Sequence, residues 1–206
     1  MIELFVSAFV TLLVVIDPLG CAPIYAGLSR GAGPRQAFTM ALRASVIATL
    51  ILFGFALFGE NLLAALHIGL DAFRIAGGLM LFLIALDMVF ERRTKRREER
   101  AETIHKAPEV EDVSVFPIAM PMIAGPGSIA TVMLLMARAQ GQAQSLVILA
   151  ALAAIMLLTF IALAAATPLM RLFGERIEAI VTRLLGVLLA ALATQYVIDG
   201  VRAAFA

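Results

Sequence analysis

The feature that most constrains this chain is an apolar run from Leu4 to Leu28 that holds one charged residue, Asp17, and two prolines, Pro18 and Pro23. About 20 apolar residues suffice to cross the hydrocarbon core of a membrane as a helix. Each proline lacks a backbone donor and collides with the preceding turn, so the run predicts a helix that breaks or kinks near the bilayer midplane. Backbone groups freed at that depth persist only where protein or a water-filled cavity satisfies them, so we expect a site at the break.

A second run of the same kind lies in the other half of the chain. Residues 113–137 contain no charged side chain, and Pro121, Gly125, Pro126 and Gly127 interrupt them. Two interrupted hydrophobic segments at corresponding places in two halves of a chain are the best sequence indication of a transporter binding site.

The composition is that of an integral membrane protein. The chain is 62% hydrophobic and only 15% charged, whereas soluble domains carry about 25% charged residues. The net charge of +1 gives no reason to expect a nucleic-acid partner. We therefore expect an all-α polytopic membrane protein with six transmembrane helices, of which the first and fourth are broken at the midplane. The expected spans are residues 4–28, 36–58, 70–90, 113–137, 145–170 and 182–201.

The basic residues predict the orientation in the membrane. The hydrophilic block 91–112 holds seven of the 16 Lys and Arg residues, and such a density beside a membrane helix marks the cytoplasmic side. Counting spans outward from this loop places both termini outside. We expect a multi-pass protein whose loop 91–112 lies in the cytoplasm.

An internal repeat predicts how the halves are related. Phe58-Gly59-Glu60 recurs as Phe173-Gly174-Glu175, and at an offset of 108 residues Pro18 falls on Pro126. Residues 1–90 and 113–206 each hold three spans, on either side of the basic loop 91–112. Because three is odd, the halves must insert with opposite orientation, which predicts an inverted repeat.

Asp17 is the strongest single candidate for a functional residue. A carboxylate at the bilayer centre costs at least about 2.5 kcal/mol, so it needs a partner, a cavity or a proton. Asp17 would then bind a substrate ammonium group or exchange a proton during transport. The alternative is that its side chain caps the helix that restarts at Pro18, and the two roles are compatible.

The segment Gly125-Pro126-Gly127-Ser128 is the complementary candidate. Glycines admit a ligand to the backbone, and the amides at the start of a helix bind carboxylates. If both breaks meet, these amides would take the carboxylate of a zwitterion while Asp17 takes its ammonium group. The alternative is that two proline kinks merely fill a packed bundle. The candidate substrate site comprises Asp17, Pro18, Leu19, Gly20, Cys21, Gly125, Pro126, Gly127, Ser128 and Thr131, with Asp17 also the candidate coupling residue.

These residues resemble the MarC family. The resemblance is carried over nearly the whole chain by Asp17-Pro18-Leu19-Gly20 with Pro23, Ala76-Gly77-Gly78, Pro121 with Ala124-Gly125-Pro126-Gly127, and Arg183, Gly186 and Asp199-Gly200. It implies a six-helix inner-membrane protein that transports glycine- or alanine-like amino acids, with the two breaks at the substrate site. Cys21 stands where family members usually have Asn, which removes an amide that could orient a ligand.

A secondary transporter is the first hypothesis. The chain has no Gly-x-x-x-x-Gly-Lys-Ser/Thr string, so a proton or sodium gradient would supply the energy, and no cofactor is expected. No Cys/His spacing predicts a metal site, and no enzyme activity is expected. Partners would be the small amino acid, the coupling ion and membrane lipid, and a homo-oligomer is compatible with these features.

The alternatives are an exporter of other small solutes or drugs, a regulatory membrane protein that transports nothing, and an intramembrane aspartyl-type enzyme. Such an enzyme would need a second deep carboxylate beside Asp17.

Overall fold

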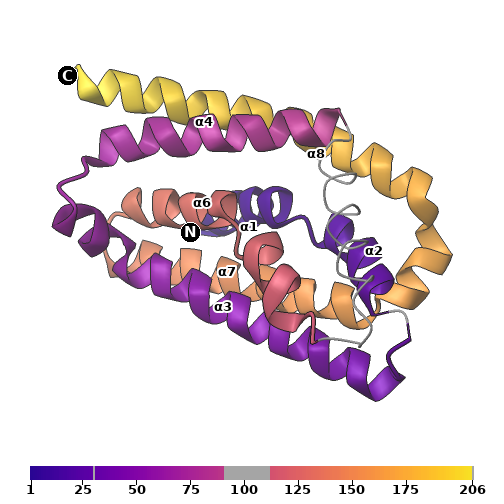
Figure 1. Cartoon of the computed structure of the whole chain (residues 1–206). Coiled ribbons are helices and arrows are strands. Elements are labelled where there is room, and N and C mark those ends of the chain that lie inside the picture. Colours follow the sequence, from indigo (N-terminus) through magenta and orange to yellow (C-terminus); the bar gives the residue numbers. More distant parts are fainter. Residues whose placement is uncertain (30, 91–111, 206) are drawn as a thin grey trace.

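The computed structural model describes residues 1–29, 31–90 and 112–205, with the side chains of 170–179 excepted. All regular secondary structure among the described residues is helical, and short turns connect the helices (Figure 1). The elements are α1 (Ile2–Ile16), α2 (Pro18–Leu28), α3 (Pro34–Ala65), α4 (Leu70–Val89), η1 (Ser114–Ile123), α6 (Pro126–Ala137), α7 (Gln142–Ala164) and α8 (Ala166–Ala204). The expected basic loop 91–112 lies outside the described residues except for Asp112.

Five helices in the described part of the chain are long and apolar enough to cross a membrane, and there are six such spans if the bent pair η1–α6 crosses as one. The chain is therefore an all-α polytopic membrane protein, as its composition predicts. Several boundaries differ from the expectation, since α3 ends at Ala65 rather than at residue 58 and α7 ends at Ala164 rather than at residue 170. The largest difference lies at the start of α8. The helix α8 runs for 39 residues and begins at Ala166, whereas the apolar run predicted a start at residue 182. Polar residues end an apolar run without ending a helix, and only residues 180–204 of α8 qualify as a span.

The first span is interrupted at Asp17. This residue has left-handed backbone angles, φ 55° and ψ 67°, and it both ends α1 and begins α2. Pro18 then occupies the first position of α2, where its missing N–H is not needed. Pro23, by contrast, lies inside α2 without ending it. A proline within a helix removes one hydrogen bond, and neighbouring helices in a membrane bundle compensate for that loss.

The fourth span is interrupted more strongly. In η1 the wide turns are closed by hydrogen bonds between residues five apart, such as Ala124 N–H to the carbonyl of Ala119 at 2.9 Å. Phe116 and Met120 have extended backbone angles within this segment, because a residue that precedes a proline avoids the helical conformation. The axes of η1 and α6 differ in direction by 51°. The predicted break of the fourth span is therefore observed.

Helix packing joins the two halves of the chain closely. The helices α4 and α8 pack along much of their length, as Figure 1 shows, and α3 packs against α7. The remaining main contacts between the halves are α1 with α7, α3 with η1, α2 with α8, α4 with α6, α2 with α7, α3 with α6, α1 with α6, α1 with α8, and α2 with η1.

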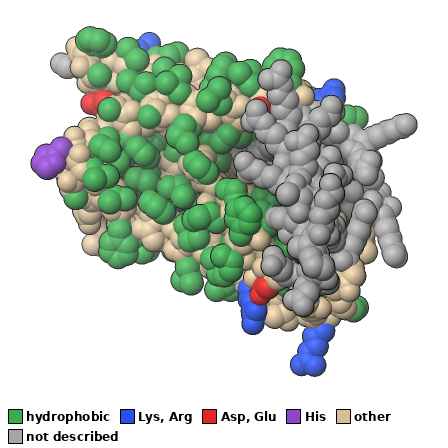
Figure 2. Space-filling view, viewed as in Figure 1, with side chains coloured by type: hydrophobic (Ala, Val, Ile, Leu, Met, Phe, Trp, Pro, Cys, Tyr) green, Lys and Arg blue, Asp and Glu red, His purple; other side chains and the backbone are tan. Residues whose placement is uncertain are grey.

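Glycines allow α4 and α8 to approach closely. A Cβ atom on Gly78 would lie 2.9 Å from the carbonyl oxygen of Ala193, and one on Gly200 would lie 3.0 Å from that of Asp71. Small residues at such contacts let helices pack tightly in lipid, where burial of apolar surface gives no driving force between helices. Hydrophobic side chains cover much of the visible face between the charged ends (Figure 2), as a lipid-facing surface requires.

Candidate functional site at the two helix breaks

Asp17 is buried, with 2% of its surface exposed. Its Oδ1 accepts a hydrogen bond of 3.0 Å from the backbone N–H of Gly20, so the carboxylate caps α2. A Cβ atom on residue 20 would lie 2.2 Å from Oδ2 of Asp17. Glycine at position 20 is therefore what leaves room for the carboxylate, and the capping role considered from the sequence is observed.

The other candidates on α2 divide between the interior and the surface. Pro18 and Gly20 are buried with Asp17. Cys21 is also fully buried, and its thiol donates to the carbonyl oxygen of Ile16 at 3.5 Å. Leu19 is 38% exposed, so its side chain faces the surface of the bundle. The interior of this break is thus formed by small residues and by backbone.

The start of α6 presents backbone amides to the interior. Gly125 precedes the helix with extended angles and caps it with no side chain, and Pro126 takes the first helical position. The next two amides belong to Gly127 and Ser128, both buried, and amides of a first turn have no acceptor within their helix. They lie at the positive end of the helix dipole. The Pro126 ring itself is exposed, so it positions the backbone and forms no part of the buried surface.

Thr131 lies one turn further along α6, on the same face as Gly127 and Ser128. It is fully buried, and its Oγ1 has no hydrogen-bond partner in the described part of the chain. A buried hydroxyl without a partner costs about 1 to 3 kcal/mol. Thr159 on α7 is a useful contrast, because it is equally buried but donates to the carbonyl oxygen of Ile155 at 2.8 Å.

The structure brings the two breaks together. The helix α1 packs against α6, and α2 packs against η1. A Cβ atom on Gly127 would lie 3.7 Å from Cγ1 of Val15, two residues before Asp17, and 2.4 Å from Cδ1 of Ile84 on α4. Val15 and Ile84 therefore line the region beside Gly127. The sequence did not identify them as site residues, because an apolar residue within an apolar run has no feature that distinguishes it.

The chemistry of this region is limited to a few groups. They are one buried carboxylate, first-turn amides and the hydroxyls of Ser128 and Thr131. The described residues include no cluster of three or more His, Cys, Asp or Glu that could hold a metal ion. Such an arrangement is suited to holding a small polar molecule through hydrogen bonds.

A bundle of apolar helices with two interrupted spans in contact defines a polytopic α-helical membrane protein. The profile described as MarC family integral membrane protein matches residues 2–205, and the chain belongs to this family.

Curated relatives span nearly the whole chain. A UPF0056 membrane protein from Methanocaldococcus jannaschii is 33% identical over 203 residues, which cover 98% of each chain. The UPF0056 inner membrane protein YhgN from Escherichia coli is 34% identical over 200 residues, covering 96% of this chain and 95% of the relative. A UPF0056 membrane protein from Aquifex aeolicus is 34% identical over 97% of this chain and 92% of its own length. No solved structure matches the chain.

Proposed function

We propose that this protein is a secondary transporter of small neutral amino acids of the glycine and alanine kind. The observation that carries the proposal is the contact between two broken spans, where the buried carboxylate of Asp17 and the side-chain-free start of α6 lie on neighbouring helices. Broken helices that supply half-helix ends to a ligand are the usual construction of transporter binding sites.

The groups at the breaks match the two charges of an amino acid. The amides of Gly127 and Ser128 would bind the substrate carboxylate, as helix starts do with anions. The Thr131 hydroxyl, which has no hydrogen-bond partner among the described residues, would donate to it as well. Asp17 would bind the ammonium group. Val15 and Ile84 close around Gly127, so a substrate with a small side chain fits best.

The pattern of helix contacts supports alternating access between inverted repeats. If α1–α4 are exchanged with η1–α8 in order, the main contacts between the halves map onto one another, except that α1–α8 has no counterpart in η1–α4 among them. The pair α1–α7 maps onto η1–α3, α2–α8 onto α6–α4, α2–α7 onto α6–α3, and α1–α6 onto η1–α2, while α3–α7 and α4–α8 map onto themselves. A twofold axis in the membrane plane would produce this matching, and one repeat could then rock against the other.

Asp17 would also couple transport to an ion gradient. Protonation would neutralise the carboxylate at membrane depth, where a charge is costly, and sodium held by freed carbonyl groups is the second route. In the proposed orientation both termini lie outside the inner membrane and residues 91–112 lie in the cytoplasm.

The test is uptake of labelled glycine and alanine by proteoliposomes, with an imposed pH gradient, a sodium gradient or neither. We expect gradient-driven uptake by the parent protein. Asp17→Asn keeps a residue able to cap a helix but cannot bind a proton, so it should abolish the response to the pH gradient. Thr131→Val should weaken uptake about tenfold through the loss of one hydrogen bond to a charged group.

The matched control is Thr159→Val, a buried threonine on α7 whose hydroxyl is already satisfied within its helix. This variant should transport as the parent does. Absence of uptake by the parent under every gradient would contradict the proposal. Unchanged pH-driven uptake by Asp17→Asn would remove that residue from the coupling mechanism.

A further inference from the structure

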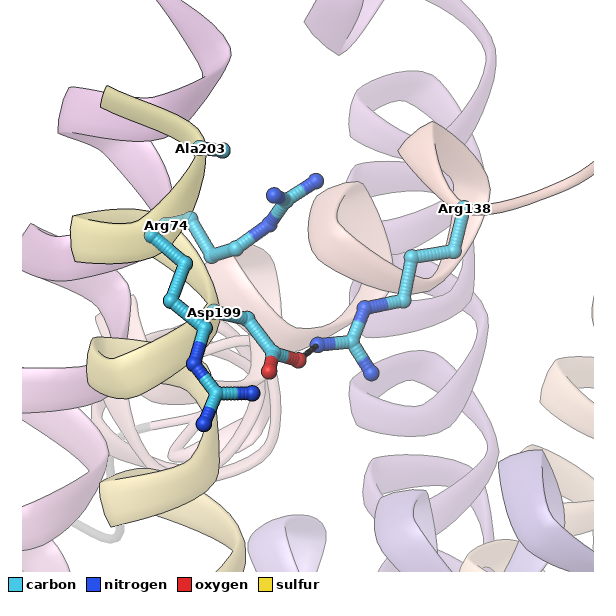
Figure 3. A pocket seen from close by; sticks show the side chains of 5 residues that line it. Arg74, Arg138, Asp199 and Ala203 are labelled. Carbon is cyan, nitrogen blue, oxygen red and sulfur yellow. Dashed lines mark hydrogen bonds and ion pairs between the residues drawn. The ribbon is translucent and has the colours of Figure 1, made fainter. Parts of the chain in front are cut away.

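A cluster of charged residues lies at one end of the bundle, far from the helix breaks. Arg74, Arg138, Asp199 and Arg202, together with Ala203, line a hollow of about 390 Å³ (Figure 3). Arg74 follows the start of α4 by one turn, Arg138 caps the end of α6, and Arg202 lies in the last turn of α8. Three spans therefore end around this hollow, at the depth of a membrane–water interface.

Arg138 is held firmly by its neighbours. Its guanidinium donates to Asp199 Oδ2 at 2.6 Å, and Figure 3 shows the two groups facing each other. It also lies 4.4 Å from the ring centre of Tyr196. The other oxygen of Asp199 accepts from the Gln195 amide at 2.6 Å. Asp199 thus bridges α6 and α8, and the described residues show no ion pair between it and Arg74 or Arg202.

Arg74 is held much less completely. Its side chain is 18% exposed, and its nearest carboxylate is Asp71, at 3.7 Å from Nη1. Its Nε is buried and has no hydrogen-bond partner in the described part of the chain. A guanidinium offers five donors in a fixed plane, so Arg74 still has donors to give.

The charge around the hollow is not balanced. Arg74, Arg138 and Arg202 carry three positive charges, against two negative charges on Asp71 and Asp199. Arg202 takes part in no ion pair that the described residues show. An anion in the hollow would balance the excess charge and supply acceptors to Arg74 and Arg202. Guanidinium groups bind phosphate oxygens with paired hydrogen bonds.

We propose that this hollow is a binding site for a phosphate group, separate from the site at the helix breaks and independent of the transport activity. Arg74 and Arg202 bind the oxygens, and the Arg138–Asp199 pair forms the wall. The shared chemistry is a phosphate oxyanion, supplied either by the headgroup of an anionic phospholipid or by free phosphate. The position at the span ends favours the lipid, because arginine side chains at the ends of spans reach the level of the headgroups and pair with phosphate oxygens.

The experiment measures retained lipid and thermal stability of the whole protein in a neutral detergent. Three additions are compared: phosphatidylglycerol, zwitterionic phosphatidylcholine and inorganic phosphate. We expect phosphatidylglycerol to bind by native mass spectrometry and to raise the melting temperature, with little effect of phosphatidylcholine. Arg74→Gln and Arg202→Gln should each weaken this binding about tenfold, the effect of losing one charge-assisted contact.

Arg35→Gln is the matched control, since Arg35 is an exposed arginine in the first turn of α3 at the other end of the bundle. It should bind as the parent does. Stabilisation by inorganic phosphate that depends on Arg74 and Arg202 would support the same site with a free anion as its ligand. Equal binding of both lipids, or binding that Arg74→Gln and Arg202→Gln leave unchanged, would overturn the proposal. Arg202 is exposed in a terminal turn, so its variant remains informative if Arg74→Gln fails to fold.

Discussion

The two ends of α6 differ in the kind of polar group that surrounds them. At its start, beside the break of the first span, the polar groups are backbone amides, hydroxyls and one carboxylate that accepts a hydrogen bond from the Gly20 amide. At its other end, about 18 Å away along the helix axis, Arg138 pairs with Asp199 across to α8. Ion pairs lose much of their energy to desolvation in the interior but little near water. Polar contacts in the interior are therefore made mainly by backbone groups at short range, and polar contacts at the interface are made by charged side chains.

The largest effect should follow from a change to backbone packing at the interior break. A Cβ atom on Gly125 would lie 2.4 Å from the carbonyl oxygen of Pro121, which cannot rotate away as a side chain would. We expect Gly125→Ala to lower the free energy of unfolding by about 2 to 3 kcal/mol, the cost of an overpacked site. Unfolding in mixed detergent micelles measures this loss.

Gly54→Ala on α3 is the control, because the Cβ position at Gly54 has no neighbour within 4 Å. It should be neutral or slightly stabilising, since alanine favours a helix more than glycine does. Equal losses in the two variants would show that the break has no special demand for glycine.

A smaller effect of opposite sign is expected at Thr131. Thr131→Val removes a buried hydroxyl that has no partner in the described residues, so it should raise the free energy of unfolding by about 1 kcal/mol. Thr159→Val removes a satisfied hydroxyl and should lower that free energy by up to about 1 kcal/mol. The same unfolding assay compares the pair. A loss of stability in Thr131→Val would mean that its hydroxyl is already satisfied in the empty protein.

The cap at Asp17 should contribute about 1 kcal/mol to stability. Asp17→Ala removes the acceptor for the Gly20 amide, whereas Asp17→Asn retains a side-chain oxygen, so only the alanine variant should be destabilised. Hydrogen exchange of the Gly20 amide gives a local measurement of the same effect. Equal protection in all three proteins would show that the cap adds nothing, and would leave function as the reason for a buried aspartate.

The smallest effect is expected at the charged end. A double-mutant cycle with Arg138→Gln and Asp199→Asn should give a coupling energy of about 0.5 kcal/mol, because both side chains are about one-third exposed. The coupling should fall as salt is raised. A salt-independent coupling of several kcal/mol would place this pair in a dry environment and remove the contrast with the interior.

The main outline of the fold was predictable from local patterns. Apolar runs predicted the spans, and proline with glycine predicted the interruption before α6. The first break was expected at Pro18 with Asp17 as a possible cap, and both are observed, whereas Pro23 does not break α2. The left-handed backbone angles of Asp17 were not foreseen. Such a turn depends on hydrogen bonds between backbone N–H groups and short polar side chains, and a hydropathy pattern contains no information about these bonds. Close approach of α4 and α8 also depends on glycines, since Cβ atoms on Gly78 and Gly186 would lie against atoms of the opposite helix.

The sequence by itself determined that this chain crosses a membrane, where its helices are interrupted, and which residues at those interruptions are polar. Only the tertiary structure decided that Gly127 lies against Val15 and Ile84, and that Arg138 meets Asp199 although 61 residues separate them. The physical reason is that hydropathy and helix breaking act on neighbouring residues, whereas the position of one helix against another depends on the packing of whole helix faces.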